Sequence, residues 1–284
     1  METLVSTRRP VRELRPGDHA LLTFADDDEQ RYVAGAFVRD GLAAGDKVIY
    51  LAETARARIP GVVVPPPPGR LSVVALDALN GRSFQPHAVI EALRDEVRRA
   101  EDEGHGTIRV TADMTWALRR PNGLELLLGS EQDVERAIGP STSVIAICAF
   151  DRRHCTPGEL AALRQAHSVV VEPDPEFEDA VFRIVRTFAP TGLALSGELD
   201  ASRHIVLNNV LVKLLSSVNG SAIHLDLAGL GFIDLGAINM LADVAARRAG
   251  HGPLVLDRMS PQLRTVMETV GWHMLPGLRL GDDG

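Results

Sequence analysis

The sequence has few cysteines, little lysine and no long apolar run. Its two cysteines, Cys148 and Cys155, cannot frame a disulfide-stapled fold and cannot by themselves fill a zinc site. No apolar run approaches the roughly 18 residues that a membrane span needs, and the start of the chain lacks the apolar stretch of a signal peptide. A net charge of −8 argues against a nucleic-acid partner, because phosphate binding needs a concentrated basic face. We therefore expect a cytoplasmic protein without a direct nucleic-acid or membrane partner.

The composition is typical of a globular protein, with 45% hydrophobic and 24% charged residues. A chain of 284 residues exceeds the ~150 residues of a common single domain, so two domains are expected. The clearest change in composition is the segment EPDPEFED, where prolines and acidic residues interrupt an apolar pattern. We predict a first domain over residues 1–172, a linker over residues 173–179 and a second domain over residues 180–284.

The first part alternates apolar, strand-like runs with segments of helical periodicity. Strands are predicted at residues 19–24, 47–52, 71–75, 107–111 and 143–150, and helices at residues 29–44, 86–103, 123–137 and 157–167. Strands that are apolar throughout and separated by helices predict a mainly parallel sheet with both faces covered.

The second part predicts a smaller α/β domain. Its first two strands, residues 180–188 and 192–198, are expected to form a hairpin. Helices are predicted at residues 201–217, 236–249 and 261–270, and further strands at residues 222–227 and 253–256. Ser260 followed by Pro261 is typical of a helix start, with a hydroxyl cap and proline in the first turn.

The loop after the first predicted strand bears on nucleotide chemistry. A phosphate-binding loop there would be rich in glycine and end in Lys-Ser or Lys-Thr, but residues 26–29 are Asp-Asp-Asp-Glu. Four carboxylates repel phosphate, and we interpret them as capping the following helix, whose N-terminus favours anions. No HExxH, CxxC or GxSxG spacing is present, so we expect no metal, no cofactor and no catalytic residue.

Candidate ligand-binding residues lie near the ends of predicted strands, where parallel sheets place their ligand crevice. Asp113 and Trp116 follow one strand, and Asp151 follows another, so these residues are expected to share one rim. Asp18 and His19 precede the first strand and lie either near that rim or at the opposite end. Such a mixture of aromatic and polar groups suits a small, partly apolar ligand.

Two segments of the second part resemble the STAS domain of anti-sigma factor antagonists. They are SGELD, ending in Asp200, and LDLAGLGFIDLG, which contains Asp234 and Gly236. The resemblance implies that an anti-sigma factor of the serine-kinase type docks at Asp200, Asp234, Gly236 and Ile238. The family's phosphorylated Ser or Thr comes two residues after the second aspartate. Gly236 occupies that position, so no phosphorylation is expected there.

Four segments of the first part, in order, resemble the MEDS sensory domain of bacterial regulators. They are PGDHALLTF, GLAAGDKVIYLA, ADMTWALR and CAFDRRHC. The resemblance implies a RecA-like, mainly parallel sheet without a phosphate loop, and a role in sensing a small molecule. Asp18, His19, Asp113, Trp116 and Asp151 fall on these segments and are the expected ligand-binding residues.

The two resemblances together predict a non-enzymatic signalling regulator. The first domain would bind a small signal and control how the second domain docks an anti-sigma factor, which would alter sigma-factor-dependent transcription. Two alternatives stay open: a nucleotide-dependent enzyme on the RecA-like sheet, against which the acidic loop argues, and a structural adaptor in a signalling assembly.

Overall fold

The computed structural model describes residues 6–77, 84–218, 220–248 and 250–281. The chain divides into two compact units, Met1–Pro173 and Asp174–Gly284. The segment expected to be a linker contains strand β8 (Pro175–Glu178), which pairs with β9 (Phe182–Phe188). Proline is tolerated in β8 because β8 is an edge strand, where one side of the backbone needs no partner.

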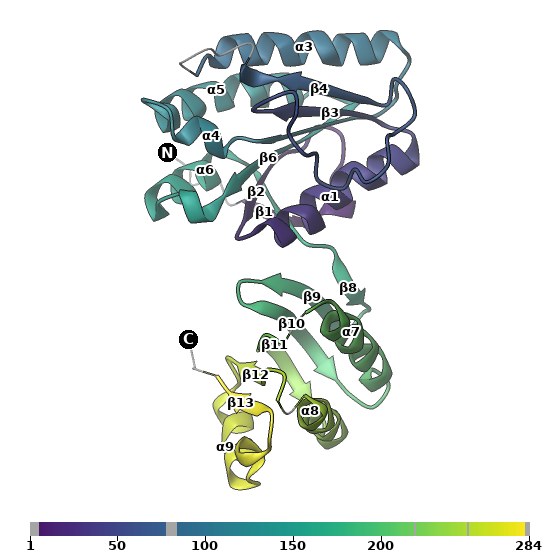
Figure 1. Ribbon diagram of the computed structural model, residues 1–284, viewed down its shortest axis with the longest axis vertical. Helices are drawn as coiled ribbons and strands as arrows, with labels where there is room; N and C mark the ends of the chain where they lie inside the picture. Colours follow the sequence, from purple (N-terminus) through teal and green to yellow (C-terminus); the bar gives the residue numbers. More distant parts are fainter. Residues whose placement is uncertain (1–5, 78–83, 219, 249, 282–284) are drawn as a thin grey trace. The chain divides into compact units, whose positions relative to one another are not determined.

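The described part of the first unit contains a seven-stranded sheet in which every pair of neighbours is parallel, as the sequence predicts (Figure 1). The strand order is β1-β7-β2-β6-β5-β3-β4. The strands are β1 (Thr7–Pro10), β2 (His19–Phe24), β3 (Lys47–Ala52), β4 (Leu71–Ala75), β5 (Ile108–Asp113), β6 (Val144–Asp151) and β7 (Val169–Glu172). The short strands β1 and β7 lie outside the strands that the sequence predicts.

Helices cover both faces of this sheet, and α1 and α3 lie on opposite sides of it (Figure 1). One face carries η1 (Val11–Glu13) and α1 (Asp27–Ala44). The other carries α3 (Pro86–Asp102), α4 (Thr115–Leu118), α5 (Gly123–Ile138) and α6 (Pro157–Ala166). Because side chains alternate along a strand, Leu21 of β2 packs in the core beneath α3 and α5, whereas Leu22 packs in the core beneath α1. A short η2 (Arg152–His154) follows β6.

The acidic loop after β2 caps α1, as the sequence predicts. The Asp26 side chain accepts a hydrogen bond from the Glu29 backbone N–H at 2.8 Å. The Glu29 side chain in turn accepts from the backbone N–H of Ala25. Burial raises the pKa of Glu29 above its ordinary value. This helix start is therefore satisfied by carboxylates of the chain itself.

The described part of the second unit contains a six-stranded mixed sheet with the order β13-β12-β11-β10-β9-β8. Besides β8 and β9, its strands are β10 (Thr191–Leu199), β11 (Ile223–Ile233), β12 (Leu254–Asp257) and β13 (Leu278–Leu280). Strands β9 and β10 form the expected antiparallel hairpin, whereas β10 to β13 pair in parallel. The fold is therefore a parallel α/β unit followed by a smaller α/β unit.

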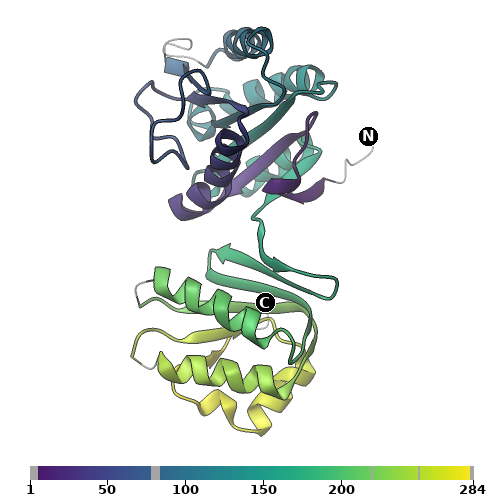
Figure 2. The same ribbon diagram turned by 90° about the vertical axis from the view of Figure 1, so that its right-hand side faces the viewer.

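Helices cover one face of the second sheet, where α7 and α8 lie side by side (Figure 2). The helical elements are α7 (His204–Ser217), α8 (Leu235–Arg247), α9 (Pro261–Thr269) and the short η3 (Trp272–Met274). Ser260 caps α9 through its side chain, with Pro261 in the first turn, as predicted. Leu225 points into the core beneath the helices, whereas its neighbours His224 and Asp226 are only partly buried.

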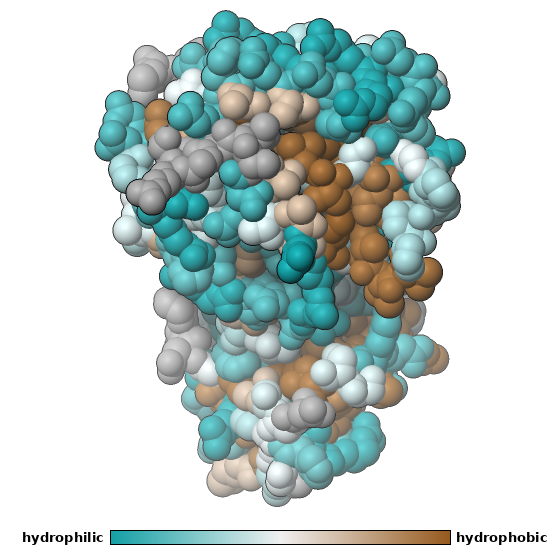
Figure 3. All heavy atoms as spheres, turned by 45° about the horizontal axis from the view of Figure 1, so that its top comes forward, coloured by the Kyte–Doolittle hydropathy of each residue, from teal (hydrophilic) through white to brown (hydrophobic). Residues whose placement is uncertain are grey.

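The surface of the first unit includes an area where apolar side chains gather (Figure 3). Among the described residues of this unit, the exposed large apolar side chains are Val63, Val64 and Val73. None of the described helices combines the length and apolarity required to cross a membrane.

Candidate functional site

The five residues expected to bind a ligand lie at two opposite ends of the first sheet. Asp113 ends β5 and Asp151 ends β6, so both lie at the carboxyl edge. His19 begins β2, which runs parallel to β6 with Phe24 opposite Asp151. His19 and the preceding Asp18 therefore lie at the amino end of the strands. Of the two positions left open for Asp18 and His19, the structure shows the opposite end of the sheet, so the five expected residues do not line one pocket.

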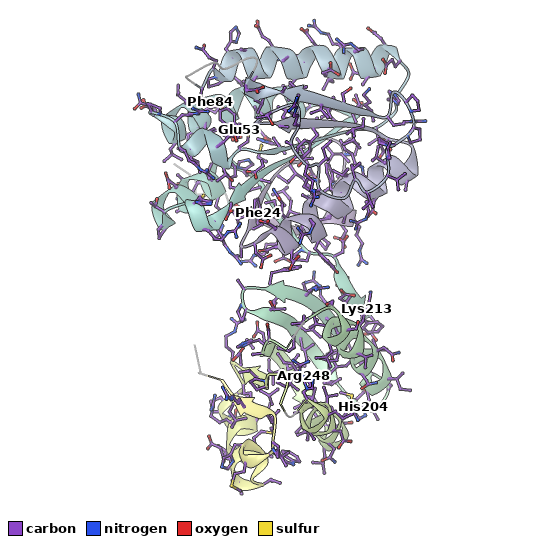
Figure 4. All side chains as sticks on the ribbon, viewed as in Figure 1. Phe24, Glu53, Phe84, His204, Lys213 and Arg248 are labelled. Carbon is purple, nitrogen blue, oxygen red and sulfur yellow. The ribbon has the colours of Figure 1, made fainter. Side chains whose placement is uncertain are left out.

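A crevice of about 210 Å³ opens at the carboxyl edge. It is lined by the ends of β3 and β5, by the loop after β3, by α4 and by Gln30 of α1. Asp113 and Trp116 are among its lining residues, together with Arg58 and Arg119. Glu53, labelled in Figure 4, also lines it. Two of the five expected residues thus share this crevice.

Asp113 holds the elements around the crevice in place. One carboxylate oxygen accepts from the backbone N–H and the hydroxyl of Thr115, at 3.0 and 2.6 Å. The other accepts from the Gln30 side chain at 3.1 Å. The Thr115 hydroxyl oxygen also accepts from the backbone N–H of Asp151 at 2.8 Å. Asp113 therefore positions α1, α4 and the end of β6 relative to one another.

Trp116, which lines the crevice, carries a buried donor without an acceptor among the described residues. Its side chain packs edge-on against Phe84, with ring centroids 5.4 Å apart, and the Arg120 guanidinium lies over its ring. The residue is 7% exposed, and its Nε1–H makes no hydrogen bond to the described residues. An unsatisfied buried donor costs roughly 1–3 kcal/mol, which a ligand with an acceptor atom would recover.

Asp151 forms an ion pair with the neighbouring Arg153. Its carboxylate accepts from Arg153 Nε at 2.9 Å and from Arg153 Nη2 at 2.6 Å, and it caps η2. Burial alone would raise the pKa of Asp151, but the hydrogen bonds from Arg153 hold it below its usual value. Asp151 is not among the crevice-lining residues, so the geometry gives it a structural role in place of the expected ligand contact.

Asp18 is likewise held within the chain. Both of its carboxylate oxygens accept from Arg9 Nη1 at 2.7 Å, and one also accepts from the Arg15 backbone N–H at 2.9 Å. This bidentate ion pair joins β1 to the start of β2. It leaves Asp18 tying the amino end of the sheet together.

His19 belongs to a group of four residues, which we term the His19 cluster: His19, Glu131, Cys148 and His167. Three of them are buried and Cys148 is partly buried. His19 Nε2 lies 3.2 Å from Cys148 Sγ, and His19 Nδ1 lies 3.3 Å from Glu135 Oε2. Burial opposes a charge on His19, but Cys148, Glu135 and Glu131 outweigh it and raise its pKa to about 10. Burial and the nearby His19 lower the pKa of His167 to about 3. Burial raises the pKa of Glu131 and of the Cys148 thiol.

Sequence reasoning missed Glu131 and His167 as partners of His19. One signal was present: Glu131 occupies the buried stripe of α5, four residues after Leu127 and seven before Ile138. A carboxylate in such an apolar stripe indicates a buried polar partner. His167 offered no such signal, because it lies just after α6 without a periodic pattern.

In the second unit, Asp234 and Gly236 meet a histidine that sequence reasoning missed. Asp234 caps α8, accepting from the backbone N–H of Ala237 at 2.7 Å. The same oxygen lies 2.7 Å from Nε2 of His204, which is labelled in Figure 4. A Cβ atom added at Gly236 would lie only 2.6 Å from His204 Cε1. His204 therefore packs where a phosphorylatable side chain would begin.

Of the other two expected docking residues, Asp200 has a side chain that is 45% exposed, whereas Ile238 is buried. Asp200 accepts hydrogen bonds from Ser202 and Arg203, which lower its pKa. Ile238 is 6% exposed and packs in the core, so the expectation that its side chain contacts a partner is wrong. Phe232 and Leu235 flank Asp234 in sequence and are exposed, as is Ile205 beside His204.

Comparisons with known proteins agree with the two-part organisation. The family model described as "MEDS: MEthanogen/methylotroph, DcmR Sensory domain" matches residues 18–168. The model described as "Mlab, STAS domain" matches residues 182–278. None of the curated proteins compared with the chain matches it. Among solved structures, a KaiC-like protein from the hyperthermophilic archaeon Pyrococcus horikoshii OT3 is 17% identical, with a TM-score of 0.40, covering 60% of this chain and 79% of that chain.

Proposed function

The chain belongs to the MEDS sensory family and continues into a STAS domain, and on this premise we propose that it is a non-enzymatic signalling regulator. Its first unit binds a small molecule at the carboxyl-edge crevice. Its second unit docks an anti-sigma factor of the serine-kinase type, and the ligand changes that docking. Coupling of ~1–3 kcal/mol between the two sites is enough for such control.

The observation that carries the sensory part of the proposal is the buried Trp116 Nε1–H, which makes no hydrogen bond to the described residues. Trp116 lines the crevice together with Arg58, Arg119 and the apolar residues Leu51 and Ala52. An indole donor, two guanidiniums and an apolar wall favour a small organic ligand with a carboxylate or carbonyl oxygen and a short apolar part.

The docking part of the proposal rests on the exposed residues around the start of α8. We term Ile205, Phe232 and Leu235 the α8 face; their side chains are 73%, 50% and 63% exposed. Apolar side chains around a polar centre, here the Asp234–His204 pair, are typical of a protein-docking surface. With glycine at residue 236, this face lacks a hydroxyl for a kinase and stays in its unphosphorylated form.

Ligand binding can be tested through the fluorescence of Trp116. The sequence contains two tryptophans, so Trp272→Phe leaves Trp116 as the only one. We expect one or more short carboxylates or ketones to shift its emission with a saturable dose response. The matched control is Trp116→Phe, in which the emission of Trp272 should not respond. The sensory part of the proposal fails if no such compound changes either the emission or the melting temperature.

Docking can be tested with purified anti-sigma serine kinases from the same organism. We expect one of them to bind the immobilised chain, and Leu235→Ser to weaken that binding by about tenfold or more, as for a buried apolar interface residue. Met274→Ser is the matched control, because Met274 is also an exposed apolar residue of the second unit, at 74%. Equal effects of the two substitutions would contradict docking at the α8 face.

A further inference from the structure

We propose that the His19 cluster is a binding site for one Zn²⁺ ion, with His19 Nε2, Glu131 Oε2, Cys148 Sγ and His167 Nε2 as its ligands. The four residues come from four different elements: the start of β2, the middle of α5, strand β6 and the end of α6. Their ligand atoms all lie within 4.8 Å of one another. His19 and His167 are 0% exposed and Glu131 is 5% exposed, so the fold has already removed these groups from water.

The distances within the cluster fit tetrahedral coordination. His19 Nε2 lies 3.2 Å from Cys148 Sγ and 3.4 Å from Glu131 Oε2. Glu131 Oε2 lies 3.5 Å from His167 Nε2. A tetrahedral Zn²⁺ ion with bonds of about 2.0–2.3 Å holds its donor atoms about 3.3–3.8 Å apart. These three distances match that geometry, and the other ligand atoms of the cluster lie no more than 4.8 Å apart.

Both histidines are oriented as metal ligands usually are. His167 Nδ1 lies 2.8 Å from the backbone carbonyl oxygen of Leu163, to which it donates. His19 Nδ1 lies 3.3 Å from the carboxylate of Glu135, to which it donates a hydrogen bond. Metal-binding histidines almost always donate their second N–H to a carbonyl or carboxylate in this way. In each ring the remaining nitrogen, Nε2, faces the cluster.

Two atoms of the cluster are unsatisfied acceptors, which supports the proposal. Neither Glu131 Oε2 nor His167 Nε2 makes a hydrogen bond to the described residues, and both atoms are buried. Because His167 Nδ1 carries its proton toward Leu163, Nε2 presents a lone pair to the carboxylate oxygen 3.5 Å away. Two buried acceptors facing one another are unfavourable unless a proton or a metal ion lies between them, and Zn²⁺ bound to both atoms would remove this repulsion.

The donor set also selects the kind of metal. When a metal ion displaces the protons of His19 Nε2 and Cys148 Sγ, the ligands are a thiolate, a carboxylate and two neutral imidazoles, and a divalent cation neutralises their two negative charges. Sulfur and nitrogen donors favour zinc over calcium or magnesium, which prefer oxygen ligands. Four protein ligands leave no open position, as in structural zinc sites. The ion would join two strands and two helices at the amino end of the first sheet.

The test uses the full chain, purified without a histidine tag. We expect about one zinc per chain by plasma mass spectrometry after extensive dialysis against metal-free buffer. Cobalt(II) added to the chelator-treated chain should give the intense visible bands of a tetrahedral site and a near-ultraviolet band from thiolate-to-metal charge transfer.

Variants assign these signals to residues. Cys148→Ser should abolish the charge-transfer band, while Cys155→Ser should leave it unchanged, because Cys155 is the only other cysteine and lies outside the cluster. Glu131→Gln should keep the band and weaken cobalt binding by roughly 10–100-fold or more. If Cys148→Ser does not fold, the wild-type spectrum and Glu131→Gln still decide the matter. A folded wild-type chain without bound zinc and without a cobalt–thiolate band overturns the proposal, as does a band that disappears in Cys155→Ser.

Discussion

Each unit pairs histidine with a carboxylate, but the two units give the pair different surroundings. In the first unit, His19 and Glu131 are almost fully buried between the sheet and α5. In the second, His204 and Asp234 are 23% and 26% exposed at the start of α8. A buried pair needs every polar atom satisfied inside the protein, whereas an exposed pair can leave part of that task to water or a partner. Burial therefore distinguishes the proposed zinc site from the proposed docking surface.

The covering of the two sheets explains this difference. Helices cover both faces of the first sheet, so a side chain on any of its central strands points into a core. The helices of the second unit share a single core on one face of its sheet, and the end of β11 is exposed at Phe232.

Removing the metal should produce the largest difference in thermal stability between the two units. If zinc is present at about 1,000 times its dissociation constant, it stabilises the folded first unit by roughly 4 kcal/mol. We expect chelation to lower the first unit's transition in differential scanning calorimetry and to leave that of the second unchanged. A chelator that moves both transitions equally would break the contrast between the units.

Introducing a side chain at Gly236 should destabilise the second unit by about 1–3 kcal/mol, as overpacking does. In Gly236→Ser, the new Cβ would lie 2.6 Å from His204 Cε1, so the histidine has to move. We expect Gly236→Ser combined with His204→Ala to be more stable to urea than Gly236→Ser alone, and to accept phosphate from a docked serine kinase. A single variant as stable as wild type would show that His204 does not occupy this space.

Removing the cap of α8 should cost the second unit about 1–2 kcal/mol. Asp234→Ala removes the bond to Ala237 and the contact with His204. Ser260→Ala is the matched control, because Ser260 caps α9 with a single side-chain bond. We expect the larger loss of unfolding free energy for Asp234→Ala in urea titrations. Equal losses would mean that the His204 contact adds nothing.

Replacing Trp116 should give the smallest effect, and only on ligand binding. Trp116→Phe removes the unsatisfied Nε1–H, and one hydrogen bond to a ligand contributes about 0.5–1.5 kcal/mol, or roughly 2–10-fold in affinity. Isothermal titration with the compound found in the fluorescence test measures this change. An unchanged dissociation constant would place the ligand away from the indole nitrogen.

Local features of the fold could be predicted because they depend on neighbouring residues. The caps at Asp26 and Ser260 follow from side chains that bond within their own first turn. The central strands, such as β2 and β6, are marked by continuous apolar runs. The short strands β1 and β13 were missed, because three or four residues carry no periodic signal.

The sequence by itself determined two units, the covered parallel sheet of the first and the glycine where a phosphorylated residue is expected, since each depends on composition, periodicity or a local motif. Only the tertiary structure decided which residues meet. Because the strands run parallel, His19 lies at the end of the sheet opposite Asp113 and Asp151. Packing buried Ile238 and brought Glu131 of α5 and His167, which follows α6, to His19. Contacts between residues more than a hundred positions apart depend on register and packing, which no local pattern encodes.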